Sequence, residues 1–251
     1  MHPRRLYAHR GASAERPENT MIAFQRAVDV GVDALELDVQ VSRDGVLLVA
    51  HDESCTRTTG ARMSWAELDA ADAARLDAGW GFVAKDGSRP FAGQGVTAPT
   101  FEQVVTTFRT VRLNVDLKGE RAISLMLELV RKLGVAERVT LASFQLATMV
   151  NVRRKGYDGE TALAQAEVAT LLALPALVWR QLPFTGDAAQ VPVHQGPLRL
   201  DRPAFLAKCH NLGLRVDYWV VDDVAEAARL LELGADGIMT NDPAAIRPLF
   251  T

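Results

Sequence analysis

The 251-residue chain has only two cysteines, Cys55 and Cys209, and they lie far apart in the sequence. Their separation matches none of the short spacings with which cysteines ligate zinc, so a thiolate metal site is excluded. We interpret both as ordinary thiols, and a disulfide between them is not expected in a reducing compartment.

The sequence also lacks an apolar run long enough to span a bilayer. The first residues, Met1 to Arg5, are basic, but the following segment, Leu6 to Ala12, contains His9 and Arg10. It therefore lacks the apolar core of a signal peptide. We expect a cytoplasmic protein without stable membrane insertion.

Neither sign of charge is in large excess. The chain has 28 Lys and Arg against 31 Asp and Glu, which gives a formal net charge of -3. This near balance of positive and negative residues provides no long-range attraction for nucleic acid or for an anionic membrane surface. No nucleic acid is expected as a partner, and the sequence predicts no oligomeric state.

Short apolar runs alternate with helical patterns along the chain, and 48% of the residues are hydrophobic. No linker or repeat divides the sequence, so we expect one domain over residues 1–251. Strands are expected to begin near residues 5, 34, 112, 139, 161, 187, 215 and 236. Eight strands separated by helices favour a (β/α)8 TIM barrel. The alternative, an open doubly wound sheet, lacks the glycine-rich phosphate loop after its first strand.

The second strand, 34–41, is followed by a hairpin. Asp44-Gly45 between apolar runs predicts a tight turn, after which 46–50 returns antiparallel. The next stretch, 53–98, is rich in glycine and proline, and we expect it to form an insertion over the barrel mouth. Helices are expected over residues 20–30, 65–76, 101–108, 121–133, 146–155, 203–212 and 224–233. Residues 173–186 fit no pattern.

Polar side chains fall on one face of two strands. Alternation places Glu36 and Asp38 on one face of the second strand, and Asp116 and Lys118 on one face of the strand near 112. Polar groups late in barrel strands face the mouth, where active sites lie. The hairpin would return His51 to a point opposite Asp38.

Three carboxylates in one mouth would repel one another and stay protonated without a counter-charge. We therefore expect Glu36, Asp38 and Asp116 to bind one divalent cation. Oxygen ligands suit Mg²⁺ or Ca²⁺. Arg10 and Lys118 are then available to hold an anion, since both side chains bind phosphate. Together with His9 and His51 this set indicates cleavage of a phosphate ester.

The same residues resemble the glycerophosphodiester phosphodiesterase family. The matching motifs are His9-Arg10-Gly11, Pro17-Glu18-Asn19-Thr20, Glu36-Leu37-Asp38-Val39, Asp44-Gly45, His51-Asp52, Arg57-Thr58-Thr59, Pro99-Thr100-Phe101, Asn114-Val115-Asp116-Leu117-Lys118, Ser143-Phe144 and Thr240-Asn241-Asp242-Pro243. The resemblance implies a (β/α)8 barrel, a divalent metal, and hydrolysis of glycerophosphodiesters to sn-glycerol 3-phosphate and an alcohol.

Two positions depart from the family pattern. Asp116 stands where the family usually has glutamate, which shortens the reach to the metal by one methylene. Trp219-Val220-Val221-Asp222-Asp223 replaces the usual Trp-Thr-Val-Asn-Asp, and this could alter the wall of the substrate pocket.

We assign His9 and His51 as the general acid and base, because imidazole titrates near neutral pH. The sequence does not distinguish the acid from the base. Glu18 either reaches the site as a ligand or orienting group, or only shapes its loop. Trp219 either packs against the glycerol carbons or belongs to the core. His194 and His210 lie outside the motifs, and we expect surface or structural roles for them.

Two other functions are compatible with the sequence. A lysophospholipase D would use the same chemistry on lysophospholipids, and would need an apolar groove for the acyl chain. A non-catalytic phosphodiester-binding barrel would not need two histidines, since binding requires no proton transfer.

Overall fold

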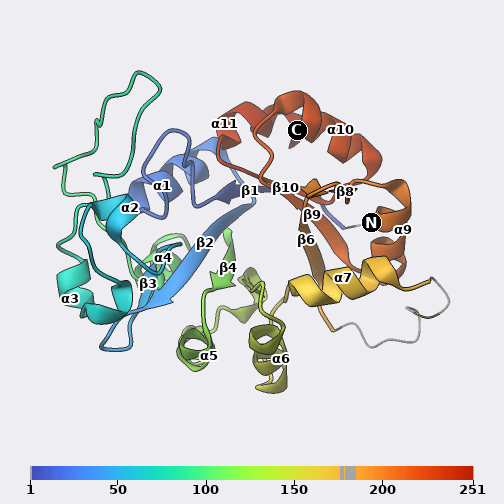
Figure 1. Cartoon of the computed structure of the whole chain (residues 1–251), viewed down its shortest axis with the longest axis horizontal. Helices are drawn as coiled ribbons and strands as arrows, with labels where there is room; N and C mark the ends of the chain where they lie inside the picture. The colour runs from blue at the N-terminus through green and yellow to red at the C-terminus, as the bar shows by residue number, and fades with distance from the viewer. Residues whose placement is uncertain (1, 176–177, 179–184, 251) are drawn as a thin grey trace.

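The computed structural model describes residues 2–175, 178 and 185–250. Seven parallel strands lie in the order β5-β4-β2-β1-β10-β9-β6, and the sheet curls with its helices outside (Figure 1). The strands are β1 Arg5–His9, β2 Ala34–Val41, β4 Arg112–Leu117, β5 Val139–Ala142, β6 Ala188–Pro192, β9 Arg215–Trp219 and β10 Gly237–Thr240. The short strand β3 Leu47–Val49 pairs antiparallel with β2, and β7 His194–Gln195 forms a small hairpin with β8 Leu198–Arg199.

A short segment joins the two edge strands of this sheet. Thr161 pairs with Leu141 of β5, and Ala162 pairs with Ala188 of β6, both in parallel. The Ala162 amide donates to the Leu141 carbonyl at 2.9 Å, and the next amide along the chain donates to the Ala188 carbonyl at 2.8 Å. The predicted (β/α)8 barrel is therefore confirmed, with the strand expected near 161 reduced to two bridging residues.

The helices surround the strands (Figure 1). They are α1 Met21–Val30, α2 Thr56–Thr59, α3 Ala70–Ala73, α4 Phe101–Thr107, α5 Glu120–Leu133, α6 Leu146–Arg154, α7 Gln165–Ala173, α9 Pro203–Asn211, α10 Val224–Leu233 and α11 Pro243–Ile246, with 3₁₀ turns η1 Trp65–Glu67, η2 Ala136–Arg138 and η3 Arg247–Phe250. Helix α1 begins and ends where the sequence predicts: the Thr20 hydroxyl accepts from the Ala23 amide, and Gly31 adopts a left-handed φ of 87°. No helix in the described part of the chain is both long and apolar enough to cross a membrane.

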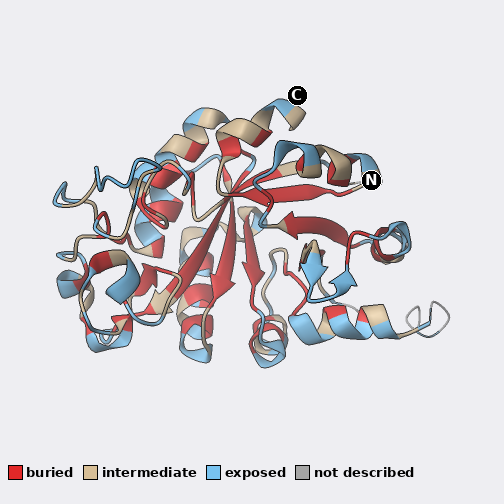
Figure 2. Ribbon diagram, turned by 45° about the horizontal axis from the view of Figure 1, so that its top comes forward, coloured by how far each residue is buried: buried red, intermediate tan, exposed pale blue. Residues whose placement is uncertain are grey.

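The main core lies between the barrel strands and the helices, and these strands are buried almost throughout, whereas the small β7–β8 hairpin is exposed (Figure 2). Alternation along β2 sends Leu35, Leu37 and Val39 into this core. The opposite faces of the strands point into the barrel, where many side chains are polar. Many of these side chains are hydrogen-bonded to one another, because an unpaired buried polar group is costly. Arg215 Nε is an exception in the described part of the chain, since it is buried without a partner.

Two of these interior pairings were not predicted. The Tyr7 hydroxyl donates to Asp217 at 3.0 Å, and Arg215 donates to the other carboxylate oxygen at 3.1 Å. The Asn114 and Gln190 amides exchange hydrogen bonds of 2.8 and 3.3 Å across the barrel. Each pairing joins strands that are far apart in the sequence, so a local pattern could not reveal it.

The insertion 53–98 differs from its prediction in two ways, of which the first is a short helix that the sequence did not predict, α2 Thr56–Thr59. The single helix expected over 65–76 is divided into η1 and α3, because Leu68 and Asp69 are extended. The Leu68 carbonyl accepts from the Arg43 amide at 2.8 Å, and the Asp69 carboxylate binds the Arg43 guanidinium. These contacts favour an extended backbone over a continuous helix.

The insertion lies to one side of the barrel, next to β2 and β3 (Figure 1). Its small core packs against the hairpin and includes Trp65, Leu68 and Cys55, together with Leu48 and Ala50. Cys55 and Cys209 are both buried free thiols, in agreement with the sequence. Most of the 173–186 stretch that fitted no pattern lies outside the described residues.

Candidate active site

All eight residues assigned to the site from the sequence line one cavity of about 350 Å³. These are His9, Arg10, Glu36, Asp38, His51, Asp116, Lys118 and Trp219. The barrel strands place them at matching heights. His9 pairs with Glu36 across β1 and β2, and Asp38 pairs with Asp116 across β2 and β4. The cavity therefore opens at the carboxyl ends of the strands, as expected for a barrel of this class.

His51 reaches the cavity in a register one residue different from the prediction. Val39 pairs with Val49, and the Ala50 amide donates to the Asp38 carbonyl at 3.0 Å. Ala50 thus takes the place expected for His51, which follows directly after. The His51 carbonyl accepts from the Gln40 side chain at 3.0 Å, and this bond holds the end of the hairpin.

His9 is oriented from the far end of the chain. Its Nδ1 lies 2.8 Å from Asn241 Oδ1, and the Asn241 side-chain amide donates to Asp222 at 2.8 Å. Since Asp222 can only accept, the Asn241 oxygen must face His9, so Nδ1 carries the proton. His9 Nε2 then faces Glu36 Oε2 at 3.9 Å. Burial lowers the pKa of His9, and the bond to Asn241 offsets this only in part.

His51 is oriented by its neighbour in the sequence. Its Nδ1 lies 2.7 Å from Asp52 Oδ1, so the carboxylate accepts the Nδ1 proton. The side chains of His51 and Asp52 are 35% and 34% exposed, whereas that of His9 is 18% exposed. The two imidazoles thus differ both in solvent exposure and in the charge of the group that holds Nδ1.

Arg10 occupies a left-handed backbone conformation, with φ of 56°, at the end of β1. There its amide donates to Glu36 at 3.0 Å, and its side chain donates to Glu18 at 3.0 Å. Its Nε lies 3.3 Å from Asp38, without the alignment of a hydrogen bond. Gly11 follows with φ of 82°, and a Cβ there would lie 2.7 Å from the Ala23 backbone. The glycine allows this loop to pack directly on α1.

The Lys118 ammonium lies between two of the three carboxylates. It is 2.8 Å from Asp38 and 2.5 Å from Asp116. Burial opposes ionisation of Asp38, but the charges of Lys118 and Arg10 outweigh it and hold the pKa of Asp38 below its usual value. Burial raises the pKa of Asp116, and Lys118 offsets only part of this.

Of the three carboxylates, Glu36 is the one whose burial is least compensated by nearby positive charge. Burial is the main cause that raises its pKa well above the usual value, and the Asp38 carboxylate adds to it. A nearby cation would reverse this, and three oxygen-donor side chains are the chemistry that Mg²⁺ and Ca²⁺ prefer. Within residues 2–175, 178 and 185–250, however, no three His, Cys, Asp or Glu side chains are arranged to hold a metal ion. The donor set fits a divalent cation in its chemistry, while Lys118 stands between two of the expected ligands.

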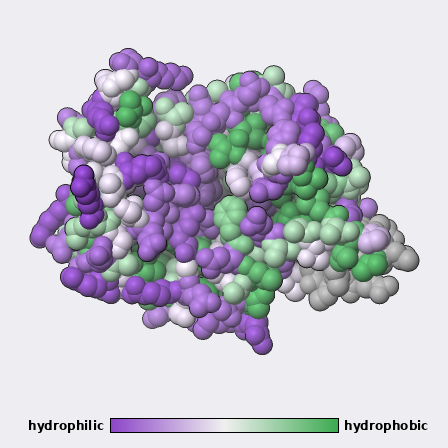
Figure 3. Space-filling view, viewed as in Figure 1, coloured by the Kyte–Doolittle hydropathy of each residue, from purple (hydrophilic) through white to green (hydrophobic). Residues whose placement is uncertain are grey.

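The other half of the cavity is apolar. Trp219 at the end of β9 packs edge-to-face on Phe144, with ring centroids 5.7 Å apart. The wall continues through Val168 and Leu172 of α7 and Val191 of β6, together with Leu163, which precedes α7, and Leu200, which follows β8. In Figure 3, hydrophilic residues dominate the side that carries the insertion, and hydrophobic residues gather on the side that carries α7. Trp219 therefore lines the cavity and also contacts the core beside Tyr7 and Met239.

A family model for the glycerophosphoryl diester phosphodiesterase family matches residues 9–245. The chain belongs to this family. A glycerophosphodiester phosphodiesterase of Caldanaerobacter subterraneus is 29% identical, over 96% of this chain and 95% of the relative. As a member of this family, the chain is a phosphodiesterase.

Solved structures of the family share the fold. The glycerophosphoryl diester phosphodiesterase domain of a Mycobacterium tuberculosis protein has a TM-score of 0.85 and 22% identity, with 98% of each chain covered. An Oleispira antarctica phosphodiesterase, solved in complex with the product sn-glycerol 3-phosphate, has a TM-score of 0.78 and 20% identity, with 98% and 96% covered. At these identities the likeness concerns the fold alone.

Several residues that shape this phosphodiesterase site were not assigned to it from the sequence. Asn241 and Arg57 lie in motifs that carry the family resemblance, but their contacts in space were not predicted. Asn19 also lies in such a motif: the next residue, Thr20, caps α1, and the Asn19 side chain donates to Asp38 at 3.0 Å. Glu18 takes the orienting position that the sequence left open, between Arg10 and Arg57.

The two remaining candidate histidines lie away from the cavity wall described above. His194 is exposed on β7. His210 lies in the last turn of α9, with Nε2 2.8 Å from Asp236. Both agree with the surface or structural roles expected for them.

Proposed function

We propose that this phosphodiesterase hydrolyses glycerophosphodiesters to sn-glycerol 3-phosphate and an alcohol, with one divalent cation, Mg²⁺ or Ca²⁺. The observation that carries the proposal is that two imidazoles, two cationic side chains and three carboxylates line one cavity. The product complex of the Oleispira antarctica relative supports the same substrate class. A non-catalytic barrel would have no use for two imidazoles with separately fixed Nδ1 atoms.

Glu36, Asp38 and Asp116 are the side chains that would hold the cation. When bound, it would polarise a phosphoryl oxygen and stabilise the charge that develops there. The uncompensated burial of Glu36 supports this assignment. Arg10 and Lys118 hold the phosphate, Arg10 through its fork and Lys118 as a point charge. Lys118 also binds Asp38 and Asp116, so a cation held by these carboxylates would compete with its ammonium for them and leave it available to the phosphate.

His9 is the general base in this proposal, and His51 is the general acid. Burial keeps His9 neutral, and the Asn241 bond fixes the proton on Nδ1, so Nε2 can accept a proton in the cavity. His51 lies against the Asp52 carboxylate, which stabilises the imidazolium that donates to the leaving alkoxide. Trp219 and Phe144 would pack against the carbon atoms of the substrate.

A product assay tests this function. Glycerophosphocholine is incubated with enzyme and either cation, and glycerol 3-phosphate and choline are measured. His9→Ala and His51→Ala should lose most of the turnover, whereas His194→Ala, on the exposed β7 strand, should keep it. Absence of glycerol 3-phosphate with both cations and the wild-type enzyme would refute the proposal.

A lysophospholipase D activity is the second candidate, because the apolar half of the cavity is continuous with the polar half. None of the wall residues comes from 53–98, all of which the structure describes. An acyl chain would therefore lie along α7 and β6, on the side away from the insertion. The expectation that the insertion covers the barrel mouth stays a prediction.

Helix α7 offers a matched pair of variants for this second activity. Ala169 lines the cavity, and Ala166 is exposed on the same helix. Ala169→Glu should reduce kcat/KM on lysophosphatidylcholine and leave glycerophosphocholine unaffected, while Ala166→Glu should change neither. Equal loss on both substrates in Ala169→Glu would exclude an acyl site on this wall.

The chain that catalyses this reaction is proposed to act in the cytoplasm as a single domain on small-molecule diesters. Nucleic acid has no place in this proposal, since the cations of the site are matched by carboxylates.

A further inference from the structure

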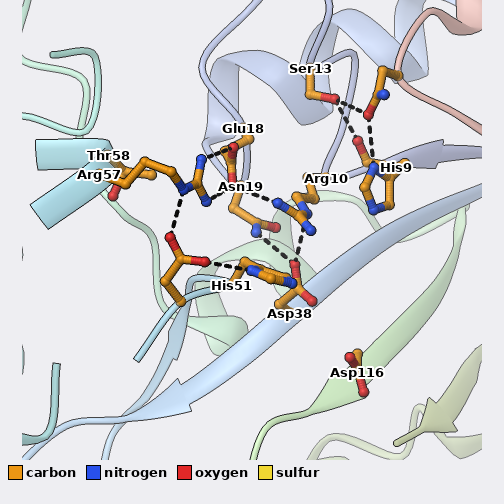
Figure 4. Close-up of polar contacts among 12 residues, drawn as sticks. His9, Arg10, Ser13, Glu18, Asn19, Asp38, His51, Arg57, Thr58 and Asp116 are labelled. Atoms are coloured by element: carbon orange, nitrogen blue, oxygen red, sulfur yellow. Dashed lines mark hydrogen bonds and ion pairs between the residues drawn. The ribbon is translucent and has the colours of Figure 1, made fainter. Parts of the chain in front are cut away.

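The guanidinium of Arg57, on the insertion helix α2, binds two carboxylates at once (Figure 4). Its Nε donates to Asp52 Oδ2 at 2.6 Å. Its two terminal nitrogens donate to Glu18, at 2.6 and 2.8 Å. Glu18 and Arg57 are 39 residues apart, so this contact joins the β1–α1 loop to the insertion.

Each of these carboxylates also binds a residue of the active site. Asp52 Oδ1 accepts from His51 Nδ1 at 2.7 Å, and Glu18 Oε1 accepts from Arg10 at 3.0 Å. The path from His51 to Arg10 thus runs through Asp52, Arg57 and Glu18 without a break (Figure 4). Of the described residues that form the cavity wall, none is Arg57, Asp52 or Glu18.

The arrangement depends on the shape of the arginine side chain. A planar guanidinium presents Nε and both terminal nitrogens in fixed directions, so it can hold two carboxylates at a set angle. A lysine ammonium is a point charge and cannot fix that angle. Arg57 is also 49% exposed, so its ion pairs contribute little to global stability. Their geometric effect on His51 and Arg10 is therefore separable from folding.

We propose that Arg57 is a positioning residue, which fixes the His51 imidazole and the Arg10 guanidinium relative to each other through Asp52 and Glu18. The proposal rests on the proposed function, in which His51 transfers a proton and Arg10 binds the phosphate. Arg57 touches neither group itself. Loss of the Arg57 guanidinium would release the partly exposed carboxylates of Asp52 and Glu18. The His51 imidazole and the Arg10 guanidinium would then both be less fixed in position.

Arg57→Ala should lower kcat/KM on glycerophosphocholine by about 100-fold, because small misplacements of catalytic groups have effects of this size. Arg57→Lys should recover only part of that loss. The matched control is Arg43→Ala. Arg43 also forms a bidentate ion pair with a carboxylate of the insertion, Asp69. Asp69, however, contacts neither His51 nor Arg10. Arg43→Ala should keep wild-type kcat/KM, and the thermal midpoints of both alanine variants should be similar.

The decisive comparison replaces Asp52 and Glu18, the two carboxylates that connect Arg57 to His51 and Arg10. In an Asp52→Ala/Glu18→Ala background both routes from Arg57 are absent, so adding Arg57→Ala should cause no further loss of kcat/KM. A contribution of Arg57 by any route other than Asp52 and Glu18 would reduce activity in that background as well. A further loss of tenfold or more in the triple variant would therefore overturn the proposal.

Two readouts do not depend on turnover. In Arg57→Ala the side-chain ¹⁵N resonances of His51 should move toward those of free imidazole, while those of His9 stay in place. Binding of sn-glycerol 3-phosphate, measured by calorimetry, should weaken in Arg57→Ala but not further in Glu18→Ala/Arg57→Ala. Unchanged His51 resonances and unchanged binding would refute the positioning role. If the wild-type enzyme released no glycerol 3-phosphate yet the His51 resonances moved as expected, the proposed function would fail and the Arg57 assignment would stand.

Discussion

Replacement of Glu160 by glutamine should destabilise the barrel at neutral pH and have no effect in strong acid. Glu160 accepts two hydrogen bonds from Arg5 of β1, at 2.7 and 2.9 Å, and one from Thr140 of β5 at 3.0 Å. Arg112 of β4 lies 3.0 Å from the same carboxylate. Since Glu160 directly precedes the bridging Thr161, it ties the closing segment to three strands.

The magnitude follows from the pKa of this carboxyl group. Burial alone would raise the pKa of Glu160, but the hydrogen bonds and charges of Arg5 and Arg112 outweigh burial and lower it to about 2. A fall from the ordinary value of 4.5 corresponds to at most about 3 kcal/mol of stability. Because the folded-state pKa is depressed, this contribution is complete above the unfolded pKa. It declines as the pH falls below about 4.5 and is lost below about 2.

Urea unfolding of the wild type and Glu160→Gln at pH 7, 4, 3 and 2 measures this contribution. The difference in unfolding free energy between them should be up to about 3 kcal/mol at pH 7 and shrink toward zero at pH 2. Glu128→Gln, at an exposed glutamate of α5, is the control and should show no such pH dependence. A difference that stays constant from pH 7 to pH 2 would refute the linkage argument.

The other predictions concern the active site. His9→Ala and His51→Ala should each lower turnover by about 10²–10⁴-fold with an unchanged unfolding midpoint, and near-normal activity in either folded variant would exclude its acid–base role. Arg10→Lys should have a lower kcat/KM than the wild type, because a single ammonium cannot replace a bidentate guanidinium. Wild-type kcat/KM in this variant would argue against direct contact between Arg10 and the phosphate. Chelation should abolish turnover, and added Mg²⁺ or Ca²⁺ should restore it. Asp116→Asn should weaken metal binding in calorimetry while Asp116→Glu stays active, and the cation assignment fails if turnover survives exhaustive chelation.

Much of the fold could be predicted because its signals are short in range. The alternation of Leu35, Glu36, Leu37 and Asp38 already separates a core face from a polar face, whatever the rest of the chain does. The glycine at the end of α1 acts within one helical turn in the same way. The carboxylates of β2 and β4 could be placed together because parallel strands in a barrel bring equivalent positions to the same height.

Local signals were insufficient where a distant partner competed with them. The apolar pattern over 65–76 favours one helix, but Arg43 binds the backbone and side chain of the two residues that interrupt it. At the hairpin, the turn residues predicted the antiparallel return but not its register, and the prediction for His51 was one residue in error. Register depends on side-chain packing across the pair, which a turn motif does not specify.

The sequence by itself determined the barrel and eight of the residues that line its cavity, because strand alternation and motif spacing act over a few residues. Only the tertiary structure decided how those residues are held. Asn241 reaches His9 across 232 positions, and Arg57 reaches Glu18 across 39. These contacts exist because closure of the barrel brings the loops of its first, second and last strands to one mouth. No pattern within a single strand or helix contains that information.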